Sequence, residues 1–194
     1  MEIGLHIADF TYPAGPTGLA DDLSRIAVAA EEQGFSRVSV MDHLWQIRPV
    51  GPVETDMLEA YTVLGYLAAR TEKVDLLAWV TAVTYRDPGL LVKAVTTLDV
   101  LSKGRAMLGI GAAWNDEEAT GLGLFFPPTA ERFERLEETL RRAGHQKSTD
   151  AIPLAIGCFQ WLEEHNKPAD ILSLGLTTLP QLESFLQVRY FEFI

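Results

Sequence analysis

The chain has 194 residues, of which 47% are hydrophobic and 22% charged, and this composition is typical of a globular protein with a single core. Its formal net charge of −11 argues against a nucleic-acid-binding surface, which needs a basic face, and against contact with anionic membranes. The single cysteine, Cys158, excludes an internal disulfide, and no Cys/His pattern suggests a metal site. The sequence has neither an apolar run of ~18 residues nor a secretory signal. We therefore expect a cytoplasmic protein without a membrane span.

Strands and helices are predicted to alternate from the first residues onward. An apolar run at residues 3–8 predicts a strand, and apolar residues at helical spacing from Leu19 to Ala30 predict a helix that ends near Gly34. A second strand is predicted at residues 37–41. The helix after it has an apolar stripe, formed by Met57, Tyr61, Leu64 and Ala68.

Two more units of the same kind follow. The segment 74–83 is apolar on both faces and predicts a third strand, and Asp87-Pro88 is typical of a helix start. That helix is expected to end at Lys103-Gly104 and to bury one face, formed by Leu91, Ala94, Val95, Leu98 and Leu101. A fourth strand is predicted at residues 105–110. A later helix is expected to be capped by Thr129 and to have a stripe of Phe133, Leu136 and Leu140.

The remaining residues differ in character. Residues 144–150 are expected to form a polar linker, residues 152–156 and 171–174 strands, residues 180–188 a short helix, and residues 190–194 a last strand. We interpret the whole of residues 1–194 as one α/β domain, with βα units in residues 1–142 and a divergent tail in residues 143–194.

Two-sided apolar strands that alternate with amphipathic helices predict parallel, right-handed βαβ units. The pattern alone leaves a barrel and an open doubly wound sheet as alternatives, although the first turn lacks the G-x-G-x-x-G sequence of dinucleotide-binding folds. A complete (β/α)₈ barrel needs ~250 residues, so a barrel of this length would be shortened or incomplete.

Functional side chains are expected after the strands, because ligands bind at the carboxyl ends of parallel strands. The candidates there combine aromatic rings, hydroxyls, one histidine and small residues, which suits a planar ligand with polar edges. The candidate proton donor or acceptor is His43. The candidate ligand contacts are Asp42, Trp79, Val80, Thr81, Gly109, Gly111, Ala112 and Trp114.

Each candidate also has a purely structural interpretation. Asp42 and His43 could cap a loop, the glycines could permit close strand packing, and the tryptophans could belong to the core. The acids at 116–118 are expected to form a solvated first helical turn, favoured by the helix dipole. His6, inside a strand, is expected to be a hydrogen-bonded core histidine.

Three stretches, "VMDHLWQI", "VTAVTYRDPGLLVKAVTTLDVLSKGRAMLGIGAAWNDEE" and "FPPTAERFERLEETL", resemble the luciferase-like monooxygenase superfamily. The similarity covers about residues 1–142 and is greatest to the branch that uses the deazaflavin coenzyme F-420. This resemblance implies a TIM-barrel fold, a homodimer, and a flavin or deazaflavin ring at the carboxyl ends of the strands. It also implies that residues 109–114 lie beside the ring, that a non-proline cis peptide occurs near Trp79–Val80, and that His43 lies near the reacting carbon.

The chain departs from the family pattern in two places. Deazaflavin dehydrogenases for sugars and alcohols have a glutamate just after the Gly-x-Gly strand, where Trp114 or Asn115 stands here, which argues against those substrates. A glycine-rich strand that holds the cofactor phosphate is reduced to Gly157. The sequence therefore predicts an oxidoreductase that transfers a hydride between reduced deazaflavin and an organic small molecule. An FMN-dependent monooxygenase and a non-catalytic scaffold remain alternatives.

Overall fold

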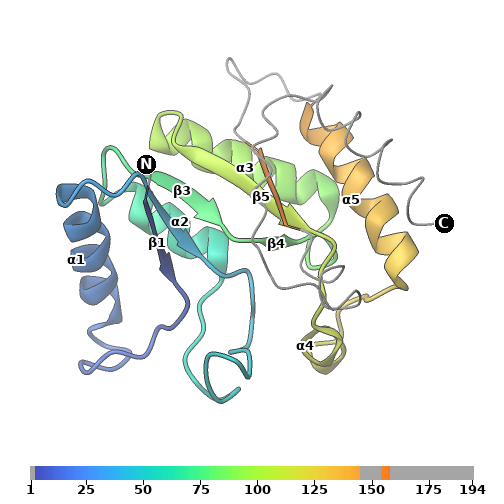
Figure 1. Ribbon diagram of the computed structural model, residues 1–194, viewed down its shortest axis with the longest axis horizontal. Coiled ribbons are helices and arrows are strands. Elements are labelled where there is room, and N and C mark those ends of the chain that lie inside the picture. Colours follow the sequence, from blue (N-terminus) through green and yellow to red (C-terminus); the bar gives the residue numbers. More distant parts are fainter. Residues whose placement is uncertain (1–2, 145–153, 158–194) are drawn as a thin grey trace.

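The computed structural model describes residues 3–144 and 154–157, which form a parallel sheet covered by helices (Figure 1). The strands are β1 (Gly4–Ile7), β2 (Arg37–Val40), β3 (Asp75–Ala78), β4 (Thr81–Ala82), β5 (Ala106–Gly111) and β6 (Leu154–Gly157). The helices are α1 (Leu19–Glu32), α2 (Ala60–Ala68), α3 (Pro88–Ser102), α4 (Asp116–Gly121) and α5 (Thr129–Gly144). The predicted alternation is confirmed. The elements expected at 171–174, 180–188 and 190–194 lie outside the described residues.

The strand order distinguishes between the two α/β architectures. β1 pairs with β2, β2 with β3, both β3 and β4 with β5, and β5 with β6, and every pairing is parallel. Helices α1, α2, α3 and α5 contact one another in chain order along one face of the sheet (Figure 1). A doubly wound sheet reverses its strand order and carries helices on both faces. The described elements are instead wound in one direction, as in part of a (β/α) barrel.

The segment 74–83 forms two strands where the sequence predicted one. Leu77 pairs with Met107, but Thr81 pairs with Ile110, so the first segment contains one residue more than β5 over the same stretch. The extra residue lies at Trp79–Val80, whose peptide bond is cis. The expected cis peptide is confirmed. The prediction of a single long strand was wrong, because the register with β5 changes by one residue within the segment.

The helices bury apolar faces in two adjoining clusters. One lies between β1–β3 and helices α1 and α2, and the other between β5 and helices α3 and α5. In α3 the buried side includes Leu91, Val92, Val95 and Leu98. Leu101 was expected there but is 70% exposed, because at 100° per residue it points about a third of a turn away from that side. None of the helices in the described part of the chain is long and apolar enough to cross a membrane.

His6 lies on the other face of the sheet. The strand registers place His6, Ser39, Leu77 and Met107 in one row, and Nδ1 of His6 lies 2.9 Å from the Ser39 hydroxyl. The hydrogen bond matches the expectation, but the side chain is exposed. The expected core position was wrong because, among the described strands, β1 is at the edge of the sheet.

Two ionisable side chains bind the backbone at the amino ends of the strands. Arg105 is buried and donates to four carbonyl oxygens at 2.8–3.0 Å, those of Ala68, Thr71, Val74 and Ser102. Glu31 at the end of α1 accepts the amides of three consecutive residues, Glu72, Lys73 and Val74. Although burial opposes it, these backbone hydrogen bonds hold the pKa of Glu31 below its ordinary value. Both side chains fix the turn that leads into β3.

Candidate functional site

The segments that follow β2, β4 and β5 meet at the carboxyl end of the sheet, where α4 also lies (Figure 1). A turn at Ala113, whose φ of 64° lies in the left-handed region, leads from β5 into α4. Asn115 caps α4, because its side-chain oxygen accepts the Glu118 amide at 3.2 Å. The predicted helical first turn is therefore confirmed.

Glu118 is the best-connected side chain of this region. Its carboxylate accepts the amides of Leu44 and Trp45, the latter at 3.0 Å. It also accepts the Tyr85 hydroxyl at 2.8 Å and lies 2.7 Å from Nδ1 of His43. Burial acts to raise the pKa of Glu118, but the hydrogen bonds from His43, the Leu44 amide and Tyr85 outweigh it and hold the pKa below its ordinary value. The carboxylate is therefore ionised near neutral pH.

The sequence analysis missed the role of Glu118. Asp116 and Glu117 are exposed, as expected, but Glu118 is only 1% exposed, so the expectation of three solvated acids was wrong for this residue. Its position three residues after Asn115 is the spacing of a capping box, and that was a signal available in the sequence. Glu118 accepts a hydrogen bond from the Asn115 side chain at its own helix end, but it also binds the loop after β2, a contact that local spacing does not reveal.

Packing holds α4 against the same loop. A Cβ atom added at Gly121 would lie 2.2 Å from the indole of Trp45, so the helix approaches this ring closely only because position 121 is a glycine. The hydrogen bonds that Glu118 accepts and the contact at Gly121 thus fix α4 on residues 43–45 at two points.

His43 lies between Glu118 and Trp114. Its ring meets the Trp114 ring edge to face, with centroids 5.4 Å apart and planes at 73°. The His43 side chain is 15% exposed, and Nε2 has no hydrogen-bond partner among the described residues. One ring nitrogen is therefore held by a carboxylate, and the other is available to a ligand.

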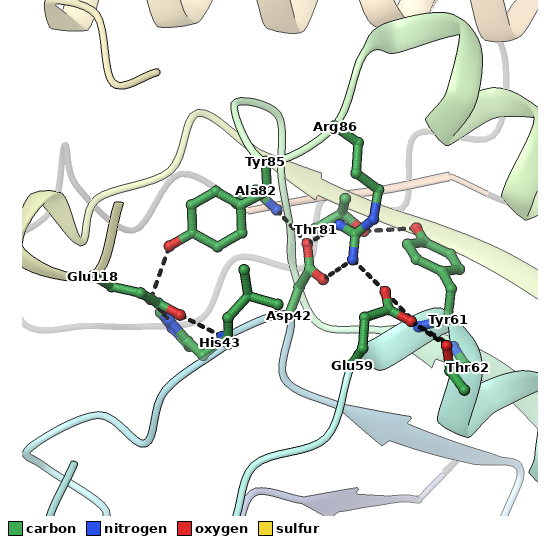
Figure 2. Close-up of polar contacts among 11 residues, drawn as sticks. Asp42, His43, Glu59, Tyr61, Thr62, Thr81, Ala82, Tyr85, Arg86 and Glu118 are labelled. Carbon is green, nitrogen blue, oxygen red and sulfur yellow. Dashed lines mark hydrogen bonds and ion pairs between the residues drawn. The ribbon is translucent and has the colours of Figure 1, made fainter. Parts of the chain in front are cut away.

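A second cluster adjoins the first (Figure 2). Arg86 donates two hydrogen bonds of 2.7 Å to the carboxylate of Asp42, which also accepts the Ala82 amide at 3.0 Å. The guanidinium contacts Glu59, the residue that caps α2, and lies 4.9 Å from the centre of the Tyr61 ring. The cluster joins the ends of β2 and β4 to the start of α2.

The buried carboxyl group of this second cluster is paired with a guanidinium. The Asp42 side chain is fully buried, and burial raises the pKa of this carboxyl group while Arg86 opposes the shift. Burial acts to lower the pKa of Arg86, but hydrogen bonds with Asp42 and Glu59 raise it overall. Asp42 has no free carboxylate oxygen, which fits the structural interpretation. A direct contact of Asp42 with a cofactor stays a prediction.

The other predicted contact residues lie at the same end of the sheet but differ in accessibility. Trp79 and Val80 are partly exposed, whereas Thr81 is buried and its hydroxyl lies 2.7 Å from that of Tyr61. Gly111 and Gly157 are register partners at the ends of β5 and β6. Ala112 is buried, and Trp114 is 37% exposed. Their role in ligand binding stays a prediction.

Gly109 has a structural explanation. A Cβ atom there would lie 2.3 Å from the carbonyl oxygen of Ala78, at the point where β3 gives way to the irregular segment. The close approach of two strands thus accounts for this glycine without a ligand. In addition, no group of three or more His, Cys, Asp or Glu side chains in the described ranges could hold a metal ion.

Comparison with known proteins agrees with this geometry. The chain is 40% identical over 120 residues to an F420-dependent glucose-6-phosphate dehydrogenase of Kineococcus radiotolerans, a match that covers 61% of this chain and 34% of that protein. The monooxygenase RslO1 of Streptomyces bottropensis superposes with a TM-score of 0.61 at 26% identity, over 75% of this chain and 44% of that one.

A coenzyme F420-dependent tetrahydromethanopterin reductase of Methanopyrus kandleri has the same fold, with a TM-score of 0.59 at 17% identity over 80% of this chain and 50% of that one. The chain spans about a third of the length of the curated relatives it matches. Residues 1–143 match the family described as luciferase-like monooxygenase. With that match over most of its length and a singly wound parallel sheet, the chain belongs to the luciferase-like monooxygenase family.

Proposed function

We propose that this chain serves hydride transfer between the reduced deazaflavin coenzyme F-420 and an organic small molecule. The observation that carries the proposal is His43, a histidine with one nitrogen held by a buried carboxylate and the other without a partner, at the carboxyl end of the sheet. Relatives at 40% identity are named F420-dependent dehydrogenases, which supports the choice of cofactor.

The residues present fit the ring part of such a cofactor. A flat heterocycle needs an apolar wall without long side chains, and Gly111, Ala112 and the half-exposed Trp114 provide small and aromatic surface at one edge. The partly exposed Trp79 and Val80 lie beside this edge, where β4 pairs with β5. We infer that residues 79–81 and 109–114 line the ring.

The charges suggest where the cofactor phosphate does not lie. Asp116 and Glu117 are exposed on the first turn of α4, and Arg48 is paired with Glu117 at 2.7 Å. An anionic phosphate group would be repelled there. We therefore assign the phosphate to the end of β6 near Gly157, the register partner of Gly111.

His43 supplies the proton chemistry in this proposal. A deazaflavin held here would supply the hydride chemistry, and a substrate carbonyl that accepts a hydride also needs a proton. Nε2 of His43 can deliver that proton, or accept it in the opposite direction. Glu118 stabilises the positive charge on the ring before the proton leaves.

The substrate stays open within the class of organic small molecules. The relatives in the comparison are named for glucose 6-phosphate, but Trp114 or Asn115 stands where sugar and alcohol dehydrogenases of the family have a glutamate. The proposal therefore leaves glucose 6-phosphate out.

An FMN-dependent monooxygenase is the second candidate. The solved RslO1 is a monooxygenase, and another solved relative with a TM-score of 0.60 at 21% identity is a monooxygenase in complex with FMN. The apolar wall and His43 would suit either ring, so a binding experiment has to separate the two cofactors.

A thermal-shift experiment on the 194-residue chain tests both candidates. A ligand that binds only the native state at 100 times its Kd stabilises it by about 2.7 kcal/mol. We expect coenzyme F-420 to raise the Tm and FMN to leave it unchanged. A shift with FMN alone would replace the deazaflavin proposal by the monooxygenase. No shift with either cofactor would leave a non-catalytic scaffold.

Two further features of the proposal rest on the family resemblance. We propose a homodimer, which light scattering at micromolar concentration tests, and a clean monomer would contradict it. We also propose the cytoplasm as the compartment, and cell fractionation with an antibody to the chain tests this.

A further inference from the structure

We propose that Glu118 is a positioning residue that fixes the tautomer of His43, so that Nδ1 carries the hydrogen and Nε2 is the nitrogen that exchanges protons. The use of this tautomer in catalysis rests on the proposed function. The tautomer itself is a property of the folded chain and can be measured without cofactor or substrate.

The donors around Glu118 determine which atom carries the hydrogen. One carboxylate oxygen accepts the backbone amides of Leu44 and Trp45. The other oxygen accepts the Tyr85 hydroxyl at 2.8 Å and the side-chain amide of Asn115 at 3.2 Å. An ionised carboxylate can only accept hydrogen bonds. The contact of 2.7 Å between Glu118 and Nδ1 of His43 therefore requires the hydrogen to be on Nδ1.

The other charged groups near His43 do not compete for Nδ1. Tyr85 is turned to Glu118, and burial together with the Glu118 charge raises the pKa of its hydroxyl, which stays protonated. Asp42 and Arg86 bind each other, and Glu117 binds Arg48 at the surface. Trp114, which carries no charge, contacts the ring of His43 edge to face.

Glu118 fixes the backbone and the ring of the same loop together. One oxygen binds the amides that directly follow His43, and the other binds its ring, so the ring cannot turn over without the loss of a contact to a buried charge. In the neutral histidine, Nε2 then carries the lone pair and can accept a proton. In the charged histidine, Nε2–H is the donor.

Nitrogen-15 NMR of the histidine rings in the full chain tests the tautomer, because the two ring nitrogens differ in chemical shift when one carries hydrogen. The His43 signals are identified by their loss in His43→Asn, and spectra are taken at the alkaline plateau of a pH titration. We expect Nδ1–H in the wild type. Glu118→Gln presents an amide NH₂ to Nδ1 and should convert His43 to Nε2–H.

Glu117→Gln is the matched control, because Glu117 is the exposed neighbour on the same helix turn and should leave the spectrum unchanged. An Nε2–H tautomer in the wild type overturns the proposal, as does an unchanged tautomer in a folded Glu118→Gln variant. Should that variant not fold, the wild-type spectrum alone decides. In an active preparation, Glu118→Gln should lower kcat by roughly 10²-fold with little change in KM.

The two failures can be told apart. If the tautomer is as proposed but no cofactor shifts the Tm, the positioning role of Glu118 stands and the proposed function fails. If a cofactor binds and the tautomer is reversed, the function stands and the role of Glu118 fails.

Discussion

The two ends of the parallel sheet both hold buried or partly buried ionisable groups, but these groups bind different partners. At the amino end, Arg105 donates to four backbone carbonyls and Glu31 accepts three backbone amides. At the carboxyl end, Asp42 pairs with Arg86, and Glu118 with His43. One end stabilises turns, whereas the other holds side chains whose protonation states depend on one another.

This difference distinguishes charged groups bound by the backbone from charged groups bound by other titratable side chains. The hydrogen-bond partners of Arg105 and Glu31 are backbone groups and the Thr71 hydroxyl, none of which titrates. A cluster of titratable side chains responds to pH, and here it leaves Nε2 of His43 without a partner among the described residues. Burial alone does not distinguish the two kinds of site, because Arg105 and Glu118 are both buried.

Replacement of His43 should have the largest effect. His43→Asn removes the group that we propose to move the proton, and it should lower turnover by roughly 10²–10⁴-fold while the chain stays folded. The measurement is the steady-state rate with the cofactor that binds. His6→Asn is the control, since His6 is exposed on β1. Full turnover by His43→Asn would reduce the residue to a loop contact.

Replacement of Arg86 should destabilise the carboxyl end in a pH-dependent way. Arg86→Met leaves Asp42 buried without its counter-ion, which should cost about 3–5 kcal/mol of unfolding free energy at pH 7. Without Arg86, burial keeps the pKa of Asp42 above its unfolded value, so the protonated form is favoured in the folded chain. The loss relative to wild type should therefore shrink as the pH falls, in urea denaturation at several pH values. A constant difference would show that Asp42 is not the cause.

Replacement of Arg105 at the amino end is the matching experiment. Arg105→Met leaves several buried carbonyls without donors and should cost about 3 kcal/mol, as measured by urea denaturation. Because carbonyls do not titrate, the difference from wild type should be nearly independent of pH above 4.5, the ordinary pKa of Glu31, whose pKa is lowered in part by the charge of Arg105. A loss that already shrinks above that pH, or that shrinks in acid as much as for Arg86→Met, would remove the distinction between the two ends.

Replacement of Glu31 should have the smallest effect. Glu31→Gln keeps the acceptor but removes its charge, and it should cost about 1 kcal/mol at neutral pH. The folded pKa of Glu31 is lowered, so its contribution is present above the unfolded value of about 4.5 and is lost as the pH falls through the folded value. The variant should thus have a flatter stability curve below pH 4.5. An unchanged curve would mean that the charge contributes nothing to the turn.

The fold could be predicted from the sequence because its signals are local. Apolar periodicity located α1, α2 and α3, and strand runs located β1, β2 and β5 within a residue or two. The division of segment 74–83 was not predicted as two strands, since a register change depends on the neighbouring strand. The exposure of Leu101 was missed because a stripe of apolar residues does not reveal where the buried side of a helix is centred.

The candidate site was predicted in part. The position of His43 after β2 followed from the rule for parallel sheets, and its contact with Trp114 agrees with the expected neighbourhood. The expected proximity of His43 to residues 79–81 stays a prediction. Glu118 was not predicted, because its partners are loop amides and a histidine far away in the sequence. The Asp42–Arg86–Glu59 cluster was missed for the same reason, as its members come from three different segments.

The bond between His43 and Glu118 spans 75 residues, and this distance has a consequence for synthesis on the ribosome. His43 leaves the ribosome first, and at 5–20 residues per second Glu118 follows it on the order of 4 to 15 s later. During that interval the first strands and helices can pair, because their contacts are already outside. The histidine, however, has neither its carboxylate nor the indole of Trp114, so a nascent chain stalled before residue 114 would carry the scaffold of the site without an oriented acid–base group.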